Sequence, residues 1–521
     1  MIFLRRSCVL LILLVSAIDG YSGDTLQVNS FNSFRLINIE NLWLSTGNSS
    51  GLFFNGSKKL IAFDAETTLK NGDFHRISEG GDIDKYSFNT GSYLSIGDKL
   101  FAEGSFAYNN LDEKGARWSG TYDPYRGNPY LLTDSLSGTS WHKENYRLTG
   151  QLAYTFSNNL ILGCGVNYFV AVAAKQKDPR PENMVTQIEF HPSLILLKNN
   201  YNLGFDIGYR NRKEEIQYNT YRSNFTPNYF MFKGLGFYSK EIEDGYYRFQ
   251  SCREVFAGMQ FEKEFEGLQS LSELRFNYTS EGIEDGGSVI AKEDGGDWKT
   301  YEVKLNQQLK RINDKNIHVI GGKFNFFNGD GTEYTQTKVK EGDVTRYITI
   351  SKNLKFTRQT IFGEISYNCL KMLNKNDVDW DINTSITAIN NSEKYYYVPE
   401  IFTSSYFNIA GNAEIQKNFY FGVMHFAPSI NARYSSNISS NVFLSNLTEI
   451  TNTQRQEIYM QEFDFYTADV LNLGGEIQLG YFPKNIKSID QMNLCLMFDY
   501  WTQMEMQTKS TLVSVKVGFV F

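Results

Sequence analysis

Apolar and polar side chains alternate along most of the chain after residue 58. A clear example covers residues 146–156, where every second position except Gly150 is apolar or aromatic. A period of two places successive side chains on opposite faces of a β-strand. The alternating segments have about ten residues, which is the length of a tilted strand that crosses a bilayer. The pattern therefore predicts strands with one face in lipid and the other in water.

Short turns and longer polar loops separate these segments. We expect short turns at residues 97–99, 157–159, 198–200, 311–316, 417–418 and 483–488, and longer connections at residues 110–143, 218–246, 327–355 and 436–467. Strict alternation of short turns and long loops, with an even strand number, is typical of outer-membrane β-barrels and puts both chain ends in the periplasm. We predict an all-β fold, a transmembrane antiparallel β-barrel over residues 57–521. It has eighteen strands, or sixteen as the alternative, near residues 59, 86, 100, 145, 160, 185, 201, 249, 270, 298, 317, 357, 378, 406, 419, 470, 490 and 511.

Two prolines and the chain end add detail to the predicted barrel. Pro192 and Pro428 fall inside predicted strands, where proline removes a donor of the hydrogen-bond ladder, so each implies a bulge or a strand end nearby. The last strand, residues 511–521, has valines and phenylalanines on one face and ends with Phe519 and Phe521. This ending resembles the terminal signature that outer-membrane barrels present to the barrel-assembly machinery, so we predict that Phe519 and Phe521 form the assembly signal.

Residues 1–20 have the features of a secretory signal peptide. Arg5 and Arg6 form a basic start, and residues 8–15 form an apolar run that is too short to span a bilayer as a helix. Small residues follow, which places cleavage near Ala17 to Gly20. No apolar stretch of about 18 residues remains after cleavage, so a helical membrane protein is excluded. We expect the mature protein in the outer membrane of a Gram-negative bacterium.

Residues 21–56 precede the barrel and do not form paired strands. In this stretch Asn38 can cap a helix, and Leu42, Trp43 and Leu44 can act as apolar anchors. The lumen of a barrel of this size is too wide to be filled by the side chains of its own wall. We expect the segment either to fold into the lumen as a plug or to lie as a periplasmic segment against the barrel rim.

Composition and charge narrow the class further. The chain has 33 Tyr, 40 Phe and 42 Gly but only 9 Pro among its 521 residues, which is a strand-rich profile. Its net charge is −7, or −9 without the two signal-peptide arginines. Phosphate binding needs clustered Lys and Arg, so we expect no nucleic-acid partner. The four remaining cysteines are far apart, and we expect them to be small apolar side chains on a sheet, with a disulfide as the alternative: Cys164, Cys252, Cys369 and Cys495.

Few residues indicate catalysis or metal binding. The letters G-x-S-x-G occur at residues 47–51, but they precede all predicted strands, whereas the hydrolase elbow needs a strand before its serine. The five histidines are separated in sequence and are typical of surface polar residues. Acid-glycine runs at residues 284–287, 293–297 and 330–333 favour solvated turns over calcium sites. We expect no catalytic residues, no cofactor and no metal, so the protein is predicted not to be an enzyme.

The predicted outer loops are rich in aromatic residues, which should not remain in water. These side chains can pack together over the pore, or they can form a recognition surface for a partner protein or a sugar-like ligand. The candidates for partner binding are Trp118, Tyr122, Tyr125, Tyr130, Trp141, Tyr229, Phe230, Tyr395, Tyr396 and Tyr397.

Three stretches carry a resemblance to a known family: NLWLSTGNSSGLFF from Asn41, DPYRGNPYLLTDSLSG from Asp123, and ENYRLTGQLAYTF from Glu144. With them, the chain resembles an uncharacterised family of outer-membrane β-barrels from the Bacteroidota. The resemblance implies a barrel in outer-membrane lipid that works beside a TonB-dependent receptor or a surface lipoprotein, and it supplies no catalytic residues. The chain lacks the large plug domain and the size of such a receptor, so it would be an accessory.

Three functions remain open at this point. The leading hypothesis is a barrel with a transport, channel or transport-accessory role, because its strands enclose a lumen with polar positions. The alternative is a barrel scaffold whose aromatic extracellular loops bind a partner protein or a glycan. The third, an outer-membrane hydrolase, lacks an assembled acid, base and nucleophile in the sequence.

Overall fold

The computed structural model describes residues 30–521, except residues 57–58, 135–138, 222–223, 225, 243–244, 287–291, 314, 343, 375–376, 445–455, 485 and 487. The predicted signal peptide and residues 21–29 lie outside the described residues. Within the described part of the chain, no helix is both long enough and apolar enough to cross a membrane.

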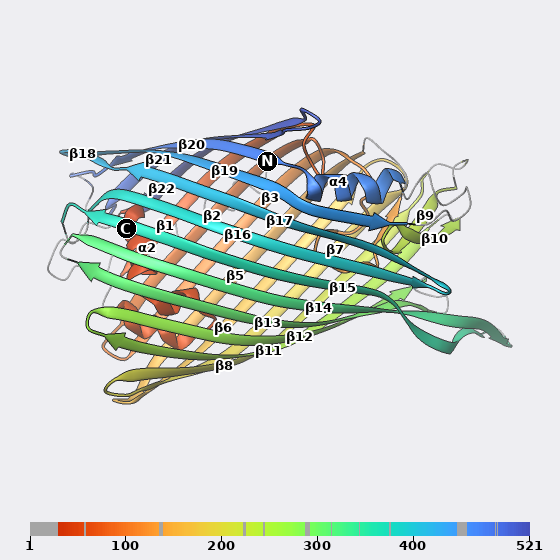
Figure 1. The fold of residues 1–521 in the computed structure, drawn as a ribbon, viewed down its shortest axis with the longest axis horizontal. Helices are drawn as coiled ribbons and strands as arrows, with labels where there is room; N and C mark the ends of the chain where they lie inside the picture. The colour runs from red at the N-terminus through yellow and green to blue at the C-terminus, as the bar shows by residue number, and fades with distance from the viewer. Residues whose placement is uncertain are drawn as a thin grey trace.

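Eighteen strands form one closed antiparallel ring (Figure 1). The ring closes because β1 pairs with both β2 and β22, with Ala62 opposite Val520. The short strand β18 (Phe419–Phe421) pairs with β19 just beyond the end of β17. The strands of the ring are β1 (Leu60–Gly72), β2 (Asp82–Ile96), β3 (Leu100–Ala116), β5 (Thr139–Ser157), β6 (Leu160–Lys175), β7 (Arg180–Leu197), β8 (Tyr201–Asn219), β11 (Tyr246–Phe265), β12 (Leu268–Asp285), β13 (Glu293–Asn313), β14 (Asn316–Glu341), β15 (Val344–Met372), β16 (Val378–Tyr397), β17 (Glu400–Lys417), β19 (Met424–Phe443), β20 (Val470–Tyr481), β21 (Gln491–Gln503) and β22 (Lys509–Val520).

The predicted antiparallel barrel with eighteen strands is therefore confirmed, and the alternative of sixteen is wrong. At one end of the ring, the turn end, neighbouring strands are joined at residues 97–99, 158–159, 198–200 and 266–267, and β1 begins and β22 ends there. At the other end, the loop end, long connections cover residues 117–138, 220–245 and 444–469. The loop end also has short connections at residues 176–179 and 398–399, so the expected strict alternation of short and long connections is wrong.

The two faces of the ring have opposite chemistry. On β22, Val513, Val515 and Val517 point outward and are 41–45% exposed, whereas Ser514 between them is buried. Inward-facing charged side chains such as Arg248 are also buried. A protein dissolved in water buries its large apolar side chains and exposes its charges. The reverse distribution is that of a transmembrane β-barrel.

Two strands are much longer than the alternation predicted. β14 has 26 residues and β15 has 29, and their pairing continues to Glu341 opposite Val344. The long loop expected at residues 327–355 is therefore wrong, because these residues form a hairpin that projects beyond the ring at the loop end (Figure 1). The register shifts after Gly331 and after Thr335, so the side chains no longer follow one strict alternation where the hairpin leaves the ring.

The two prolines lie where the ladder is interrupted. Between β7 and β8, pairing stops at Phe190 and resumes at Ser193 in the same register, so Pro192 lies in a short gap rather than at a bulge or a strand end. Pro428 lies next to Ser429, the last residue of β19 that pairs with β17. The strand end predicted near Pro428 is confirmed.

Shorter elements lie at both ends of the ring. The turn end contains α2 (Phe31–Glu40) and the 3-10 helices η1 (Leu42–Ser45) and η2 (Ser49–Asn55). The loop end contains a three-stranded sheet of β4 (Leu132–Asp134), β9 (Asn228–Gly234) and β10 (Phe237–Ile242), together with η3 (Gln456–Met460) and α4 (Gln461–Thr467).

Candidate functional site

The segment before β1 consists of three short helices joined by tight turns. α2 begins after Ser30, whose backbone N–H donates to a serine hydroxyl in the first turn at 2.9 Å. Asn41 and Asn48 start η1 and η2, because each side-chain oxygen accepts a backbone N–H at 3.0 Å. Asn38, the cap expected from the sequence, lies inside α2 and is exposed, so that prediction is wrong.

Residues 30–56 lie inside the ring at its turn end and form polar contacts with distant strands. The indole N–H of Trp43 donates to Glu262 of β11 at 2.8 Å, and both side chains are buried. Across the ring, the Arg35 guanidinium donates to Asp381 of β16 at 3.0 Å. The Arg35 side chain is 42% exposed, but Asp381, like Trp43 and Glu262, is buried, and buried polar groups are stable only when they are paired. The polar groups of the wall and of the segment are therefore hydrogen-bond partners of one another.

Close backbone approach accompanies these contacts. The Ser50 N–H donates to the hydroxyl of Ser193 on β7 at 3.1 Å, and the two hydroxyl oxygens are 3.0 Å apart. A Cβ added to Gly163 would lie 2.5 Å from the Ser50 nitrogen, and one added to Gly204 would lie 2.6 Å from the Trp43 ring. Glycine at both wall positions leaves the space that the segment occupies.

Inward-facing apolar side chains form a belt inside the ring at the level of this segment. Leu36, Leu42, Trp43 and Leu52 of the segment are buried against them. The belt comes from eight strands, namely Phe101, Ala153, Ile161, Ile195, Leu271, Ile317, Val319, Leu370 and Val378. Ile37 packs on Leu60, Ala62 and Val520, so the contacts also include the seam where the ring closes. Elsewhere the inward face is rich in buried polar groups, so the apolar belt matches the segment.

The aromatic side chains predicted for partner binding gather at the loop end, but most of them are buried. Trp118, Tyr130, Trp141, Tyr229, Phe230 and Tyr395 are each at most 7% exposed. Tyr122, Tyr125 and Tyr396 are half-buried, and Tyr397 is 48% exposed. These residues pack on one another and on the inner wall in several clusters. Their contact with an external partner remains a prediction.

Wall side chains fix the loop of residues 117–134 inside the ring. Lys175 is fully buried, and its ammonium donates to the backbone oxygen of Ser119 at 2.6 Å and to Asp134 at 3.2 Å. Arg248 forms a two-pronged ion pair with Asp285 and also donates to the backbone oxygen of Tyr130 at 3.2 Å. Buried, fully partnered charges of this kind hold one geometry. The loop is therefore part of the barrel interior.

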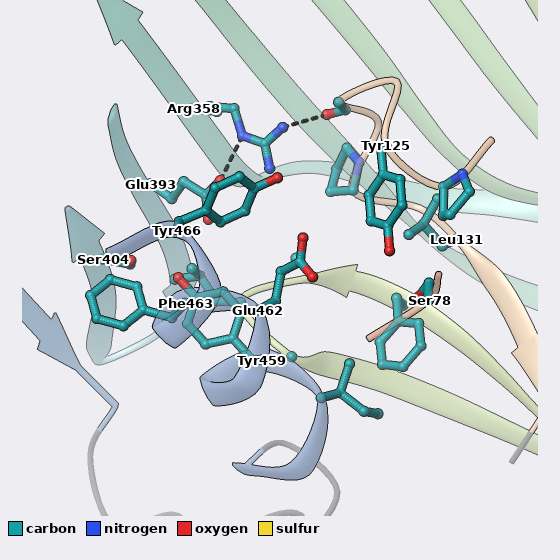
Figure 2. A pocket seen from close by; sticks show the side chains of 18 of the residues that line it. Ser78, Tyr125, Leu131, Arg358, Glu393, Ser404, Tyr459, Glu462, Phe463 and Tyr466 are labelled. Carbon is teal, nitrogen blue, oxygen red and sulfur yellow. Dashed lines mark hydrogen bonds and ion pairs between the residues drawn. The ribbon is translucent and has the colours of Figure 1, made fainter. Parts of the chain in front are cut away.

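A cavity of about 320 Å³ lies between this loop, α4 and the wall of β15, β16 and β17 (Figure 2). On its wall side, Arg358 donates to Glu393 at 2.6 Å and to the backbone oxygen of Gly127 at 2.9 Å, as the dashed lines in Figure 2 show. The rings of Tyr406 and Tyr466 stack in parallel, 5.6 Å apart. The cavity therefore combines aromatic faces with a fixed ion pair.

Arg76 forms the opposite side of this cavity. Its guanidinium lies 3.2 Å from the centre of the Tyr125 ring and donates to Glu462 of α4 at 2.6 Å. Burial raises the pKa of Tyr125, so its phenol stays protonated. Sequence reasoning missed Arg76, Arg358 and their carboxylates, because they come from separate strands and loops and form no local motif.

The other residues that the sequence offered as candidates for metal binding, a disulfide or hydrolysis have structural roles. In the acid-glycine runs, Asp285 pairs with Arg248, and Glu284 pairs with Lys292 at 2.7 Å. Among the described residues, no three His, Cys, Asp or Glu side chains gather as metal ligands. The four cysteines of the described chain are free, so the disulfide alternative is wrong. Ser49 of the G-x-S-x-G letters is buried in η2, and no strand precedes it from residue 30 onward, where the described chain begins.

The model of a family of unknown function, DUF6850, matches residues 49–521. The chain belongs to this family. No curated protein matches the sequence.

Several solved structures are similar to this chain, with low sequence identity and low TM-scores. The ferric citrate transporter FecA in its unliganded form is 10% identical, with 89% of this chain and 79% of that chain covered and a TM-score of 0.39. The outer membrane transporter YddB from Escherichia coli is 8% identical, with 88% and 80% covered and a TM-score of 0.39. The ferric yersiniabactin uptake receptor FyuA from Yersinia pestis is 10% identical, with 89% and 80% covered and a TM-score of 0.38. These values are too low for the likeness to carry an argument about this member of the DUF6850 family.

Proposed function

We propose that this protein is a transport barrel of the outer membrane and that residues 30–56 are a plug that closes its lumen at the turn end. The outward valines of β22 and the buried charges of the inner wall support a barrel surrounded by lipid. The turn end would face the periplasm, because both ends of the barrel domain lie there.

One observation carries the plug proposal: an apolar belt from eight strands faces inward where the four buried anchors of the segment lie, and nowhere else does the inner wall form so large an apolar cluster among the described residues. In a lumen filled only with water and solutes, such an apolar belt would not stabilise the barrel. Without the segment, these side chains would face water, at a free-energy cost proportional to their exposed area. The docked segment is therefore the stable state, and solute passage requires it to move.

The barrel-assembly machinery and outer-membrane lipid are the partners expected for such a barrel. An accessory role beside a TonB-dependent receptor or a surface lipoprotein also remains a prediction. The scaffold alternative depends on the aromatic residues at the loop end, and most of these are buried against the barrel itself. The transport role is therefore the better supported of the two.

The test is single-channel conductance in planar bilayers, measured on the mature protein and on a variant without residues 30–56. Heat-modifiable mobility on a gel serves as the control that the truncated barrel is folded. We expect almost no conductance from the intact protein and large, stable openings from the truncated one. Absence of conductance from both folded forms, or equal conductance from both, would overturn the proposal.

A further inference from the structure

Charges inside the ring are mostly paired. Arg210 donates to Glu189 at 2.7 Å and to Glu254 at 2.6 Å, and Lys323 donates to Glu364 at 2.8 Å. Pairing of this kind is expected, because an unpaired charge in a partly desolvated lumen is costly. A group of cations that outnumbers its carboxylates inside the same lumen therefore needs a different explanation.

Another cavity, of about 360 Å³, contains such a group of cations. It lies on the inner wall of β2, β3 and β5 to β8, beneath the loop residues Tyr122 and Asp123. Four cationic side chains line it, against the single carboxylate of Asp123: Lys85, Lys143, Arg147 and Arg212. That carboxylate already accepts the backbone N–H of Tyr125 at 3.0 Å. The lining of the cavity is therefore basic.

The cations are incompletely neutralised. Among the described residues, Lys85 has no ion pair or hydrogen bond, and Arg147 contacts only the face of the Phe169 ring, at 5.4 Å. Lys143 pairs with Glu113 at 2.7 Å, outside the lining of the cavity.

Arg212 is the most informative of the four. Its side chain is 10% exposed, and its nearest carboxylate contact is Glu214 at a long 3.4 Å. Its Nε is buried and has no hydrogen-bond partner within the described chain. Buried donors are nearly always satisfied, so this N–H calls for an acceptor that the chain does not supply.

Neutral donors complete the cavity. Asn109 donates to Asn145 at 3.0 Å, and Asn145 donates in turn to the Tyr122 hydroxyl oxygen at 3.1 Å. The Tyr122 O–H then remains a donor at the cavity. Guanidinium forks, ammonium groups and such hydroxyls are the donors that bind carboxylate and phosphate oxygens.

We propose that this basic cavity binds a small organic or inorganic anion that carries carboxylate or phosphate groups. The claim that the cavity binds an anion does not depend on the transport function proposed above. The claim that this cavity selects the transported solute does depend on it. Anion binding would neutralise Lys85 and Arg147, the two cations without a carboxylate, and give Arg212 Nε its acceptor.

The test is isothermal titration of the full-length mature protein in detergent with two probes, inorganic phosphate and citrate, at constant ionic strength set by chloride. The test variant is Lys85→Gln with Arg147→Gln, which removes the two cations that lack a carboxylate. The matched control is Lys304→Gln with Lys323→Gln, which removes two lumen cations that pair with Glu302 and Glu364.

We expect at least one probe to bind, with affinity about tenfold or more weaker in the test variant and unchanged in the control, because charge-assisted hydrogen bonds to oxyanions are strong. Absence of binding of both probes to the unmodified protein, or equal weakening in both variants, would overturn the inference. Its failure is distinguishable from that of the transport role. If the truncated barrel conducts but the full-length protein binds neither probe, only the anion site is refuted; if the full-length protein binds a probe but neither form conducts, only transport is refuted.

Discussion

Replacement of Trp43 by alanine should release the segment of residues 30–56 without unfolding the barrel. Trp43 is 1% exposed, stacks on Phe54 at 5.5 Å and donates to Glu262 at 2.8 Å. Truncation of a buried tryptophan to alanine costs about 3–5 kcal/mol. The Phe54 ring belongs to the segment itself, but the hydrogen bond to Glu262 and the packing on the inner wall exist only when the segment is docked, so most of the cost applies to docking. Since about 1.4 kcal/mol corresponds to a factor of ten, the undocked population should rise about 10²- to 4 × 10³-fold.

Hydrogen exchange measured by mass spectrometry tests this value. We expect the amides of α2 to exchange about 10²- to 4 × 10³-fold faster in Trp43→Ala, while the amides of the barrel strands keep their protection. Asn38→Ala is the matched control, because Asn38 is exposed on α2 and its contact with the wall is a long hydrogen bond from the Tyr93 hydroxyl at 3.4 Å. Unchanged exchange in α2, or loss of heat-modifiable mobility of the whole barrel, would show that Trp43 does not act by docking the segment.

Three further predictions concern the barrel. Val515→Arg places a charge on the outward face and should destabilise the barrel by about 2–4 kcal/mol in urea unfolding in lipid vesicles, whereas Thr511→Arg, nearer the strand end, should cost about 0–1 kcal/mol. Phe521→Ala keeps the backbone pairing with Ile61 but removes the ring that contacts Phe63, and membrane fractionation should show less assembled barrel; normal assembly would argue against a terminal signal. Asp285→Asn leaves Arg248 without its charge partner and should lower the free energy of unfolding by about 3–5 kcal/mol, with faster proteolysis of residues 117–134; an unchanged cleavage rate would contradict the role of the pair in holding that loop.

The ring could be predicted from the sequence because each strand has one face in lipid. Along residues 146–156, the outward positions are apolar and the inward ones are mostly polar, so the period of two is visible. The same signal is missing in residues 332–355, where β14 and β15 project beyond the ring and both faces carry polar residues such as Thr337 and Lys338. A strand pair that neither lipid nor a core covers leaves no alternation to detect, and these residues were therefore mistaken for a loop.

The interior of the barrel was predictable only in part. An aromatic loop such as residues 118–130 indicates burial, because large rings avoid water, and the structure places those rings against the wall. Ion pairs such as Arg76 with Glu462 join residues 386 positions apart and have no sequence signal. The basic cavity around Arg212 was missed for the same reason, since its cations are scattered over several strands and the net charge of the chain is negative.

A reversible cross-link between plug and wall tests the central claim most directly. The hydroxyl oxygens of Ser50 and Ser193 are 3.0 Å apart, so cysteines at both positions can approach the disulfide distance of about 2.0 Å. In a Trp43→Ala background, conductance should disappear on oxidation of this pair and return on reduction, while single-cysteine controls stay conducting under both conditions. Equal current through the oxidised and reduced forms would show that residues 30–56 do not close the lumen.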